Sequence, residues 1–289
     1  MILITGASGS VGKAVLQEAL KQQSKVRAMF RSKEDAANAF PGYQPVIADY
    51  ADKQSLLAAL NGVTSVYVVC SPIPQLVELE SNMLDACQES GVKHVVLNSA
   101  LGAADFPKSF PAWHRKVEDK LKSMRMTYTI LRPNGFLQNI AAFYAPTIRT
   151  QNAFYGNLGD SKTSYIDVTD IAVVAVKSLG GAAHIGKIYE LNGPEAISNR
   201  ELAKRISKIA GRIINYVDLP DSAYRDAMVG LGMPDWQVTA LMGLHELYQQ
   251  GGGAKTDSLL KSLIERDPVT LDQYLAANAQ EFRAQAASA

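Results

Sequence analysis

The residues with the clearest chemical pattern follow the first apolar run of the chain. Ile2-Leu3-Ile4 leads directly into Thr-Gly-Ala-Ser-Gly-Ser-Val-Gly at residues 5–12. Glycines at this spacing, between a strand and a helix, are typical of a turn that holds a dinucleotide. Gly6 permits the tight turn, Gly9 lets the backbone approach the pyrophosphate, and Gly12 lets helix and strand pack closely. The alternative is a turn that serves geometry alone.

This turn predicts the phosphate site. The helix that it opens attracts anions to its amino end, because its first N–H groups lack partners and its dipole is positive there. The residues expected to line the phosphates are Gly6, Ala7, Ser8, Gly9, Ser10, Val11 and Gly12.

The end of the second predicted strand indicates which cofactor is bound. An NAD site places an acidic residue there for the ribose hydroxyls. This chain instead has Arg31 and Lys33. A guanidinium fork matches a 2′-phosphate and a lysine adds a point charge, so we expect NADP(H) rather than NAD(H). An ordinary solvated basic loop is the alternative.

Two further cofactor ligands are predicted from strand-end position alone. Asp49 follows the third strand and is expected to accept from the adenine amino group. Ser71 follows the fourth strand and is expected to lie near a ribose of the cofactor.

The elements that position these residues alternate in the first half of the chain. Short, nearly continuous apolar runs are separated by segments with apolar residues at three- and four-residue spacing, which indicates repeated βαβ units. Gly91 is expected to end the third helix as a C-cap. The pattern predicts an α/β fold, a Rossmann-type doubly wound parallel sheet, with strands at 2–4, 26–30, 45–48, 65–69, 94–98 and 128–131, and helices at 11–21, 54–60, 76–90 and 112–123.

The second half predicts a smaller, mostly helical lobe. Ser198 and Glu201 resemble a capping box, and residues 250–254, Gln-Gly-Gly-Gly-Ala, are interpreted as a flexible stretch between two surface helices. We assign 1–150 to the cofactor and 151–289 to a region that completes the sheet and forms the substrate lobe. The expected helices are 169–179, 200–211, 223–231, 235–249, 258–265 and 271–282, and the expected strands are 188–191 and 214–217.

Composition favours a small-molecule partner. The 29 Lys and Arg nearly balance the 28 Asp and Glu, so the formal charge of +1 attracts neither nucleic acid nor an anionic membrane. The two cysteines, Cys70 and Cys87, are read as packing residues, and no apolar run is long enough to span a bilayer. We therefore expect a cytoplasmic protein without a membrane segment.

The histidines do not indicate a metal site. They are widely separated and lack cysteines or carboxylates at ligand spacing, and the chain contains no Gly-x-Ser-x-Gly elbow. We predict neither a metal site nor a hydrolase triad for the four histidines, His94, His114, His184 and His245.

Several segments in sequence order resemble the NmrA-like group of atypical short-chain dehydrogenases/reductases. This group includes NADPH quinone reductases, azo and triphenylmethane dye reductases, and cofactor-sensing regulators. The resemblance runs nearly end to end and is strongest to the quinone reductase branch. It rests on residues 5–12, Asp49-Tyr50, 113–118 (Trp-His-Arg-Lys-Val-Glu), 131–136 (Leu-Arg-Pro-Asn-Gly-Phe), 166–172 (Ile-Asp-Val-Thr-Asp-Ile-Ala) and 267–282.

The resemblance also shows a departure from the wider superfamily. The usual Tyr-x-x-x-Lys pair is absent, and His114 and Glu118 occupy its spacing. A carbonyl reduction needs a proton for the nascent alkoxide, whereas a quinone gives a stable hydroquinone anion. His114 is the candidate donor or substrate contact, with a structural histidine as the alternative. Glu118 either orients His114 or makes a surface pair with Lys122.

Strand ends supply two more candidates. The superfamily often keeps a hydroxyl beside the substrate, which makes Ser99 a candidate hydrogen-bond partner of a quinone oxygen, or else a strand-end cap. Either Asn134 or the backbone of Phe136 is expected to orient the nicotinamide carboxamide. Scattered aromatic side chains are either flat surfaces for the acceptor or core residues, namely Tyr144, Tyr155, Tyr165 and Trp236.

Three functions stay open at this point. The first is a flavin-independent NADPH reductase of quinones or similar flat aromatic acceptors. The second is a redox sensor that binds NADP(H) and acts through a protein partner, and the third is an azo or triphenylmethane dye reductase. A homodimer is expected only because twofold oligomers are common.

Overall fold

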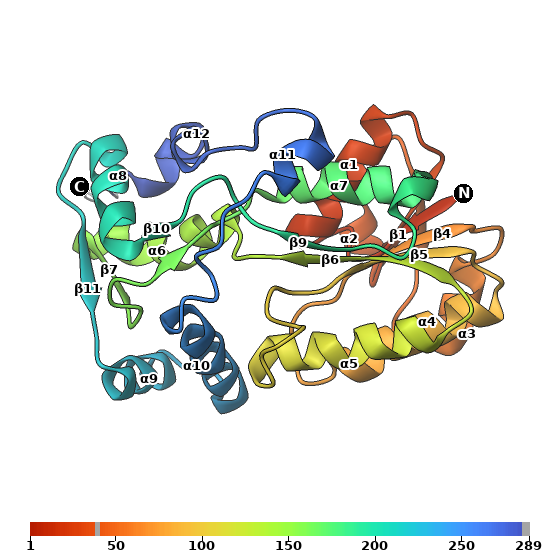
Figure 1. Cartoon of the computed structure of the whole chain (residues 1–289), viewed down its shortest axis with the longest axis horizontal. Coiled ribbons are helices and arrows are strands. Elements are labelled where there is room, and N and C mark those ends of the chain that lie inside the picture. Colours follow the sequence, from red (N-terminus) through yellow and green to blue (C-terminus); the bar gives the residue numbers. More distant parts are fainter. Residues whose placement is uncertain (38–40, 285–289) are drawn as a thin grey trace. The chain divides into compact units, whose positions relative to one another are not determined.

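The computed structural model describes residues 1–37 and 41–284 of the chain (Figure 1). It contains two compact units. Unit 1 comprises Met1–Pro133 and Val168–Leu191, and unit 2 comprises Asn134–Asp167 and the chain from Asn192 onward. The assignment of residues 1–150 to the cofactor and 151–289 to the substrate stays a prediction about function.

Unit 1 is built on one parallel sheet, with strand order β3-β2-β1-β4-β5-β6-β9. This is the predicted doubly wound arrangement: the chain builds outward from β1 in both directions, and β9 extends the sheet as expected. All the pairings are parallel, so the carboxyl ends of the strands share one edge. The strands are β1 (Ile2–Ile4), β2 (Val26–Phe30), β3 (Gln44–Ile47), β4 (Ser65–Val68), β5 (His94–Asn98), β6 (Thr127–Pro133) and β9 (Ile188–Leu191).

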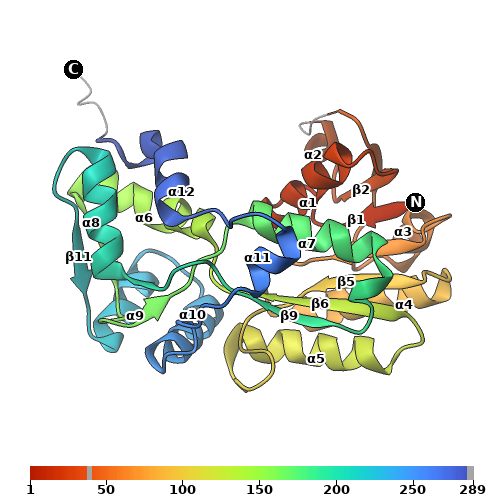
Figure 2. The ribbon, with the colours of Figure 1, turned by 45° about the horizontal axis from the view of Figure 1, so that its top comes forward.

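Helices cover both faces of this sheet (Figures 1 and 2). The pair α1 (Ser10–Lys21) and α7 (Val168–Gly180) packs on one face, and α3 (Lys53–Ala59), α4 (Leu76–Glu89) and α5 (Ser109–Ser123) pack on the other. Short helices α2 (Lys33–Ala37) and η1 (Ala182–His184) complete the unit. The core below α3–α5 is fully buried and includes Leu56, Met83, Val95, Val117 and Leu121.

Unit 2 is mostly helical, as predicted, with two small two-stranded sheets. β7 (Ala153–Gly156) pairs in parallel with β11 (Asn215–Asp218), and β8 (Lys162–Thr163) pairs antiparallel with β10 (Ile197–Ser198). Its own core includes Leu137, Phe154, Leu202, Leu275 and Phe282. The helices are α6 (Leu137–Gln151), α8 (Asn199–Ala210), α9 (Asp221–Gly230), α10 (Asp235–Gln249), α11 (Leu259–Ile264), α12 (Leu271–Ala277) and η2 (Ala279–Phe282).

Several elements differ from the sequence prediction, which contained neither α2 nor the short strands β7, β8 and β10. Helix α6 was not predicted, although it is among the longest in the chain, and it carries Pro146 inside it. The strand expected at 214–217 forms as β11 but pairs with β7 and not with the sheet of unit 1. The helix expected at 271–282 ends at Ala277 and continues as a 3-10 turn.

The glycines at residues 250–254 do not form a flexible stretch, so that interpretation was wrong. The Gly253 carbonyl accepts from Asn134 Nδ2 at 2.9 Å and from Ser164 Oγ at 3.2 Å. A Cβ at Gly252 would lie 2.4 Å from the Leu247 side chain. Gly252 and Gly253 are therefore close-packed residues that let the backbone approach its neighbours.

The cap predicted at Ser198 is present, because its hydroxyl accepts from the Glu201 backbone N–H at 3.3 Å. A full capping box is found instead at Thr270 and Gln273, where α12 begins. Gly91 adopts φ +74°, as expected after the end of α4. No helix among residues 1–37 and 41–284 is long and apolar enough to cross a membrane.

Candidate cofactor-binding and active site

The glycine turn has the geometry that a dinucleotide needs. Gly6 adopts φ +60°, which only glycine takes readily. A Cβ at Gly12 would lie 2.2 Å from the Gly6 carbonyl oxygen, so α1 packs directly against the turn. α1 begins at Ser10 with Gly9 as its N-cap, and no side chain caps it. The first N–H groups of α1 are therefore suited to an anion, and these residues fit a pyrophosphate.

A buried hydroxyl network holds this turn from below. Thr5 Oγ1 accepts from the Tyr50 hydroxyl at 2.7 Å and from the Val69 backbone N–H at 3.1 Å. It donates to the Tyr67 carbonyl at 2.9 Å. The centre of this network is Thr5, which follows β1 and directly precedes Gly6. The network ties it to Tyr50 after β3 and to the end of β4. Sequence reasoning quoted Tyr50 in a motif but gave it no role, because its partner lies far away in the chain.

The predicted cofactor ligands at the ends of β2, β3 and β4 come together at one edge. Both the Arg31 and the Asp49 charges act on the Cys70 thiol, the residue before Ser71. Arg31, Lys33, Asp49 and Ser71 are all exposed there. This edge can receive the adenosine part of a dinucleotide, and the binding roles of these residues stay predictions.

A second group of predicted residues lies at the ends of β5 and β6. Ser99 Oγ donates to Glu118 Oε1 at 2.7 Å. Arg132, which sequence reasoning did not single out, donates to both oxygens of the same carboxylate, from Nε at 2.8 Å and from Nη2 at 2.6 Å. Lys122 Nζ adds a contact at 3.0 Å. The structure thus joins Ser99 and Glu118 in one buried network.

Glu118 is a carboxylate despite being fully buried. Burial raises its pKa, but the hydrogen bonds from Arg132, Ser99 and Lys122 lower it by more, so the pKa lies below its ordinary value. The carboxylate oxygens are therefore engaged by these three residues. Of the two interpretations of Glu118, the pair with Lys122 is present, although it is not a surface pair.

His114 is buried one helical turn before Glu118, and its Nδ1 atom has no hydrogen-bond partner among residues 1–37 and 41–284. Burial lowers the pKa of His114 to about 4, which the Glu118 charge offsets only in part. The imidazole is therefore neutral at neutral pH and can donate a hydrogen bond but not a readily transferred proton.

Asn134 lies in unit 2 and is 2% exposed. Its Nδ2 donates to Ser164 Oγ at 2.8 Å as well as to the Gly253 carbonyl, and its Oδ1 accepts from the Gly135 N–H at 2.7 Å. The amide therefore has a structural role in unit 2, and its predicted contact with a carboxamide stays without support.

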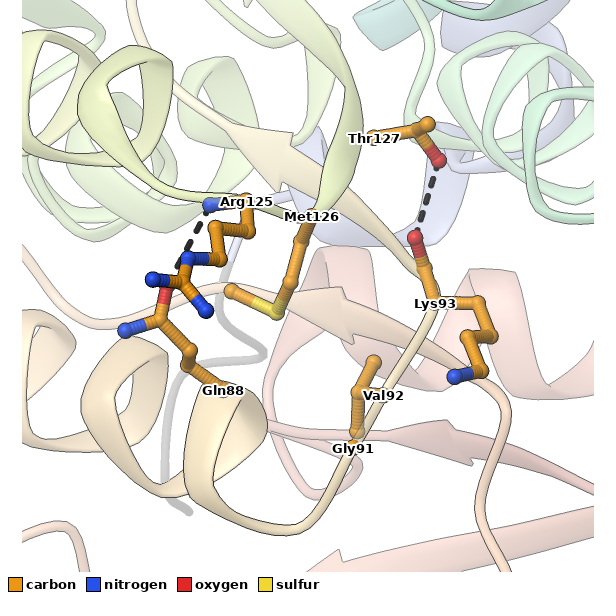
Figure 3. Close-up of a pocket in the computed structure, with 7 residues that line it drawn as sticks. All are labelled: Gln88, Gly91, Val92, Lys93, Arg125, Met126 and Thr127. Atoms are coloured by element: carbon orange, nitrogen blue, oxygen red, sulfur yellow. Dashed lines mark hydrogen bonds between the residues drawn. The ribbon is translucent and has the colours of Figure 1, made fainter.

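A pocket in unit 1 lies at the opposite edge of the sheet, where β5 and β6 begin (Figure 3). The Arg125 backbone N–H donates to Gln88 Oε1 at 3.2 Å, and Thr127 Oγ1 donates to the Lys93 carbonyl at 2.9 Å. Because doubly wound sheets bind ligands at the carboxyl ends of their strands, this pocket is not the predicted cofactor site. It is lined by Gln88, Gly91, Val92, Lys93, Arg125, Met126 and Thr127.

Fold and site together define the class of protein. A doubly wound sheet, a glycine turn that opens α1 without a side-chain cap, and polar strand ends on one edge are those of a Rossmann-type nucleotide-binding protein. The sequence profile of the NmrA-like family matches residues 1–285, and the chain belongs to that family.

Named relatives align over nearly the full chain. The NAD(P)H azoreductase of Xenophilus azovorans is 34% identical, over 98% of this chain and 100% of that protein. Quinone oxidoreductase 2 of Escherichia coli is 30% identical, over 94% of this chain and 96% of its own length. The crystal structure of the E. coli NADPH-dependent quinone oxidoreductase with NADPH superposes with a TM-score of 0.87, at 30% identity, covering 97% and 99% of the two chains.

Replacing Gly12 tests the close approach of α1 to the turn. A methyl group would collide with the backbone of Gly6, so Gly12→Ala should lose about 1–3 kcal/mol of unfolding free energy and weaken dinucleotide binding. Gly180→Ala is the control, because nothing lies within 4 Å of its added Cβ. Urea denaturation and a fluorescence titration with NADPH give both readouts. Equal behaviour of the two variants would contradict the packing role of Gly12.

Replacing Arg132 tests the buried carboxylate. Arg132→Ala leaves the Glu118 charge with fewer partners and should cost about 3 kcal/mol at neutral pH. The loss should shrink towards pH 5, because the raised pKa of Glu118 in the variant lets it take up a proton. Arg115→Ala, which breaks an exposed pair with Asp119, should cost less than about 1 kcal/mol. A pH-independent loss for Arg132→Ala, measured by urea denaturation, would show that Glu118 is not the charge concerned.

Proposed function

We propose that the protein is an NADPH-dependent oxidoreductase that reduces quinones or similar flat aromatic acceptors, without a bound flavin. The proposal is supported by the glycine turn and by relatives named as NAD(P)H-dependent reductases. NADPH, when bound, supplies a hydride from its nicotinamide ring, and the acceptor takes that hydride directly.

Arg31 is the residue proposed to select NADPH. It follows β2, where a 2′-phosphate is expected, and its planar fork matches phosphate oxygens. Ser32 Oγ accepts from the Asp35 N–H at 3.0 Å at the start of α2, and Lys33 is the first residue of that helix, two residues after Arg31. The related E. coli enzyme was crystallised with NADPH.

The observation that carries the quinone proposal is the burial of His114 and of Glu118, together with the hydrogen bonds that Glu118 accepts. Glu118 stays charged, and burial keeps His114 neutral. Among the residues described there, neither of these titratable candidates holds a proton that it can release near neutral pH. An acceptor whose reduced product is already a stable anion suits such a site, and a quinone gives that product. Positioning then becomes the main task of the protein.

The proposed roles of the three candidate residues follow from their partners. The Ser99 hydroxyl hydrogen points to Glu118, so its oxygen is an acceptor, suited to the O–H group of a hydroquinone. Neutral His114 donates a hydrogen bond from its ring N–H to the acceptor. Glu118 is a positioning residue, since it fixes the Ser99 hydroxyl without touching substrate itself.

Reduction of azo dyes is the second candidate, because the relative named as an azoreductase is 34% identical. Hydride addition to an N=N bond leaves a strongly basic nitrogen anion, which needs a proton in the same step or directly after it. Because neither His114 nor Glu118 holds a readily released proton, the site favours a quinone over an azo dye.

The test follows NADPH absorbance with protein that has been checked for absence of flavin. Oxidation should require a naphthoquinone, should be faster than with an azo dye, and should be faster with NADPH than with NADH. Faster turnover of the azo dye would favour the second candidate. Tight NADPH binding with no turnover of either acceptor would contradict the enzyme proposal and favour a redox sensor.

Replacing Arg31 tests the cofactor choice. Arg31→Ala should weaken NADPH binding by about tenfold to a hundredfold, the loss of charged hydrogen bonds to one phosphate, and should leave NADH binding nearly unchanged. Arg125→Ala is the control, because that exposed arginine lies at the start of β6 on the other edge. Titrations of both cofactors by fluorescence would contradict the role if Arg31→Ala weakened NADH equally.

Replacing His114 tests its contact with the acceptor. His114→Ala should lower kcat with a quinone by about tenfold or more while NADPH affinity stays unchanged. Because the pKa of His114 is about 4 and the ring stays neutral, the wild-type kcat should show no titration of this residue between about pH 6 and 8. His184→Ala, a partly exposed histidine on η1, is the control. Unchanged kcat in His114→Ala would return His114 to a structural role.

A further inference from the structure

Glu80 is a buried carboxyl group that the proposed reaction does not use. It lies on α4 among Leu76, Met83, Leu84 and Cys87, which form the buried face of that helix. Glu80 is 0% exposed, and in the part of the chain that the structure describes neither carboxyl oxygen makes a complete hydrogen bond, although the Cys70 backbone lies near enough to favour the charged form. An acidic residue on an apolar helix face is costly to bury and calls for an explanation.

The surroundings of Glu80 connect it with the cofactor edge, the edge of the sheet that carries the glycine turn, Arg31, Asp49 and Ser71. Its charge acts on the hydroxyl groups of Tyr50 and Tyr67 and on the thiol of Cys70. Tyr50 donates to Thr5, which directly precedes Gly6, and Cys70 directly precedes Ser71. The carboxyl group therefore lies behind the two segments that carry the turn and the predicted ribose contact.

The other titratable groups of this cluster stay in one form. Burial raises the pKa of Tyr50, Tyr67, Cys70 and Cys87 well above the neutral range, so all four remain protonated. Glu80 differs, because burial raises its pKa only to about 8, opposed in part by the Cys70 backbone. The charges of Arg31 and Asp49 act on one member of this cluster, the Cys70 thiol.

We propose that Glu80 is a positioning residue for NADPH: its uncharged carboxyl group supports the cofactor edge, and its ionisation places an uncompensated negative charge behind the bound phosphates. The inference rests on the proposed function, because it takes NADPH as the ligand. Glu80 would act from behind the residues that contact the cofactor, because its side chain is not exposed to solvent.

The sign of the effect follows from linkage. NADPH carries several negative charges, so it binds more tightly to the form with neutral Glu80, and binding favours uptake of a proton by that carboxyl. Affinity should therefore fall as the pH rises through about 8. The 2′-phosphate, with a second pKa of about 6, has lost its proton before this range and does not contribute.

The experiment compares NADPH affinity at about pH 7 and about pH 9 in the full chain, by fluorescence titration. Glu80→Gln mimics the uncharged acid, and Glu80→Met is a second uncharged variant of similar length if the glutamine fails to fold. Glu89→Gln is the control, because Glu89 lies on the same helix but is exposed and pairs with Lys53 at 2.7 Å. Thermal unfolding without cofactor is measured in parallel at both pH values.

The unmodified protein and Glu89→Gln should lose at least about threefold in NADPH affinity over this range, and the Glu80 variants should lose much less. Parallel pH profiles in Glu80→Gln or Glu80→Met and the unmodified protein would overturn the proposal. Absence of NADPH binding at every pH would overturn the cofactor assignment, and with it this inference. Thermal unfolding distinguishes the two failures. If Glu80 titrates but NADPH does not bind, the melting temperature falls between about pH 7 and about pH 9 in the unmodified protein and stays constant in the Glu80 variants.

Discussion

The close approach of α1 to β1 is the constraint on which the cofactor edge of unit 1 depends. Gly12 lies against the Gly6 carbonyl, where even a methyl group has no room. This contact brings the uncapped amino end of α1 next to the strand ends, and the Thr5 and Tyr50 hydroxyls hold the turn from below. The candidate anion site thus consists of backbone, whose direction is fixed by packing and not by flexible side chains.

A second constraint is the buried charge of Glu118. Once this carboxylate is paired with Arg132, it fixes the direction of the Ser99 hydroxyl, while burial keeps the neighbouring His114 neutral. The helix positions that have the spacing of the superfamily's proton-donating pair therefore hold a neutral imidazole and a paired carboxylate, and the proposed function gives them the tasks of contacting the acceptor and fixing Ser99. The proposed quinone chemistry follows from the absence of that proton donor, because a hydroquinone anion is stable without immediate protonation.

The sequence predicted the sheet of unit 1 well, because β-branched runs and glycine spacing are local signals. It missed α6, whose pattern is interrupted by Pro146, and the two-residue strands β8 and β10, which are too short to show periodicity. The Arg132 pair and the Tyr50 hydrogen bond escaped because their partners are distant in the chain. Glu80 was readable, since it falls on the apolar face of α4, but only burial shows that it lacks a partner.

The central claim is direct hydride transfer from NADPH to a quinone on this chain alone. The most direct test is a single-turnover measurement with flavin-free protein, a naphthoquinone, and NADPH carrying either hydrogen or deuterium at C4 of the nicotinamide. The account predicts slower oxidation of the deuterated cofactor and no reaction unless the quinone is present. Equal rates for the two cofactors, or no oxidation with cofactor bound, would contradict it.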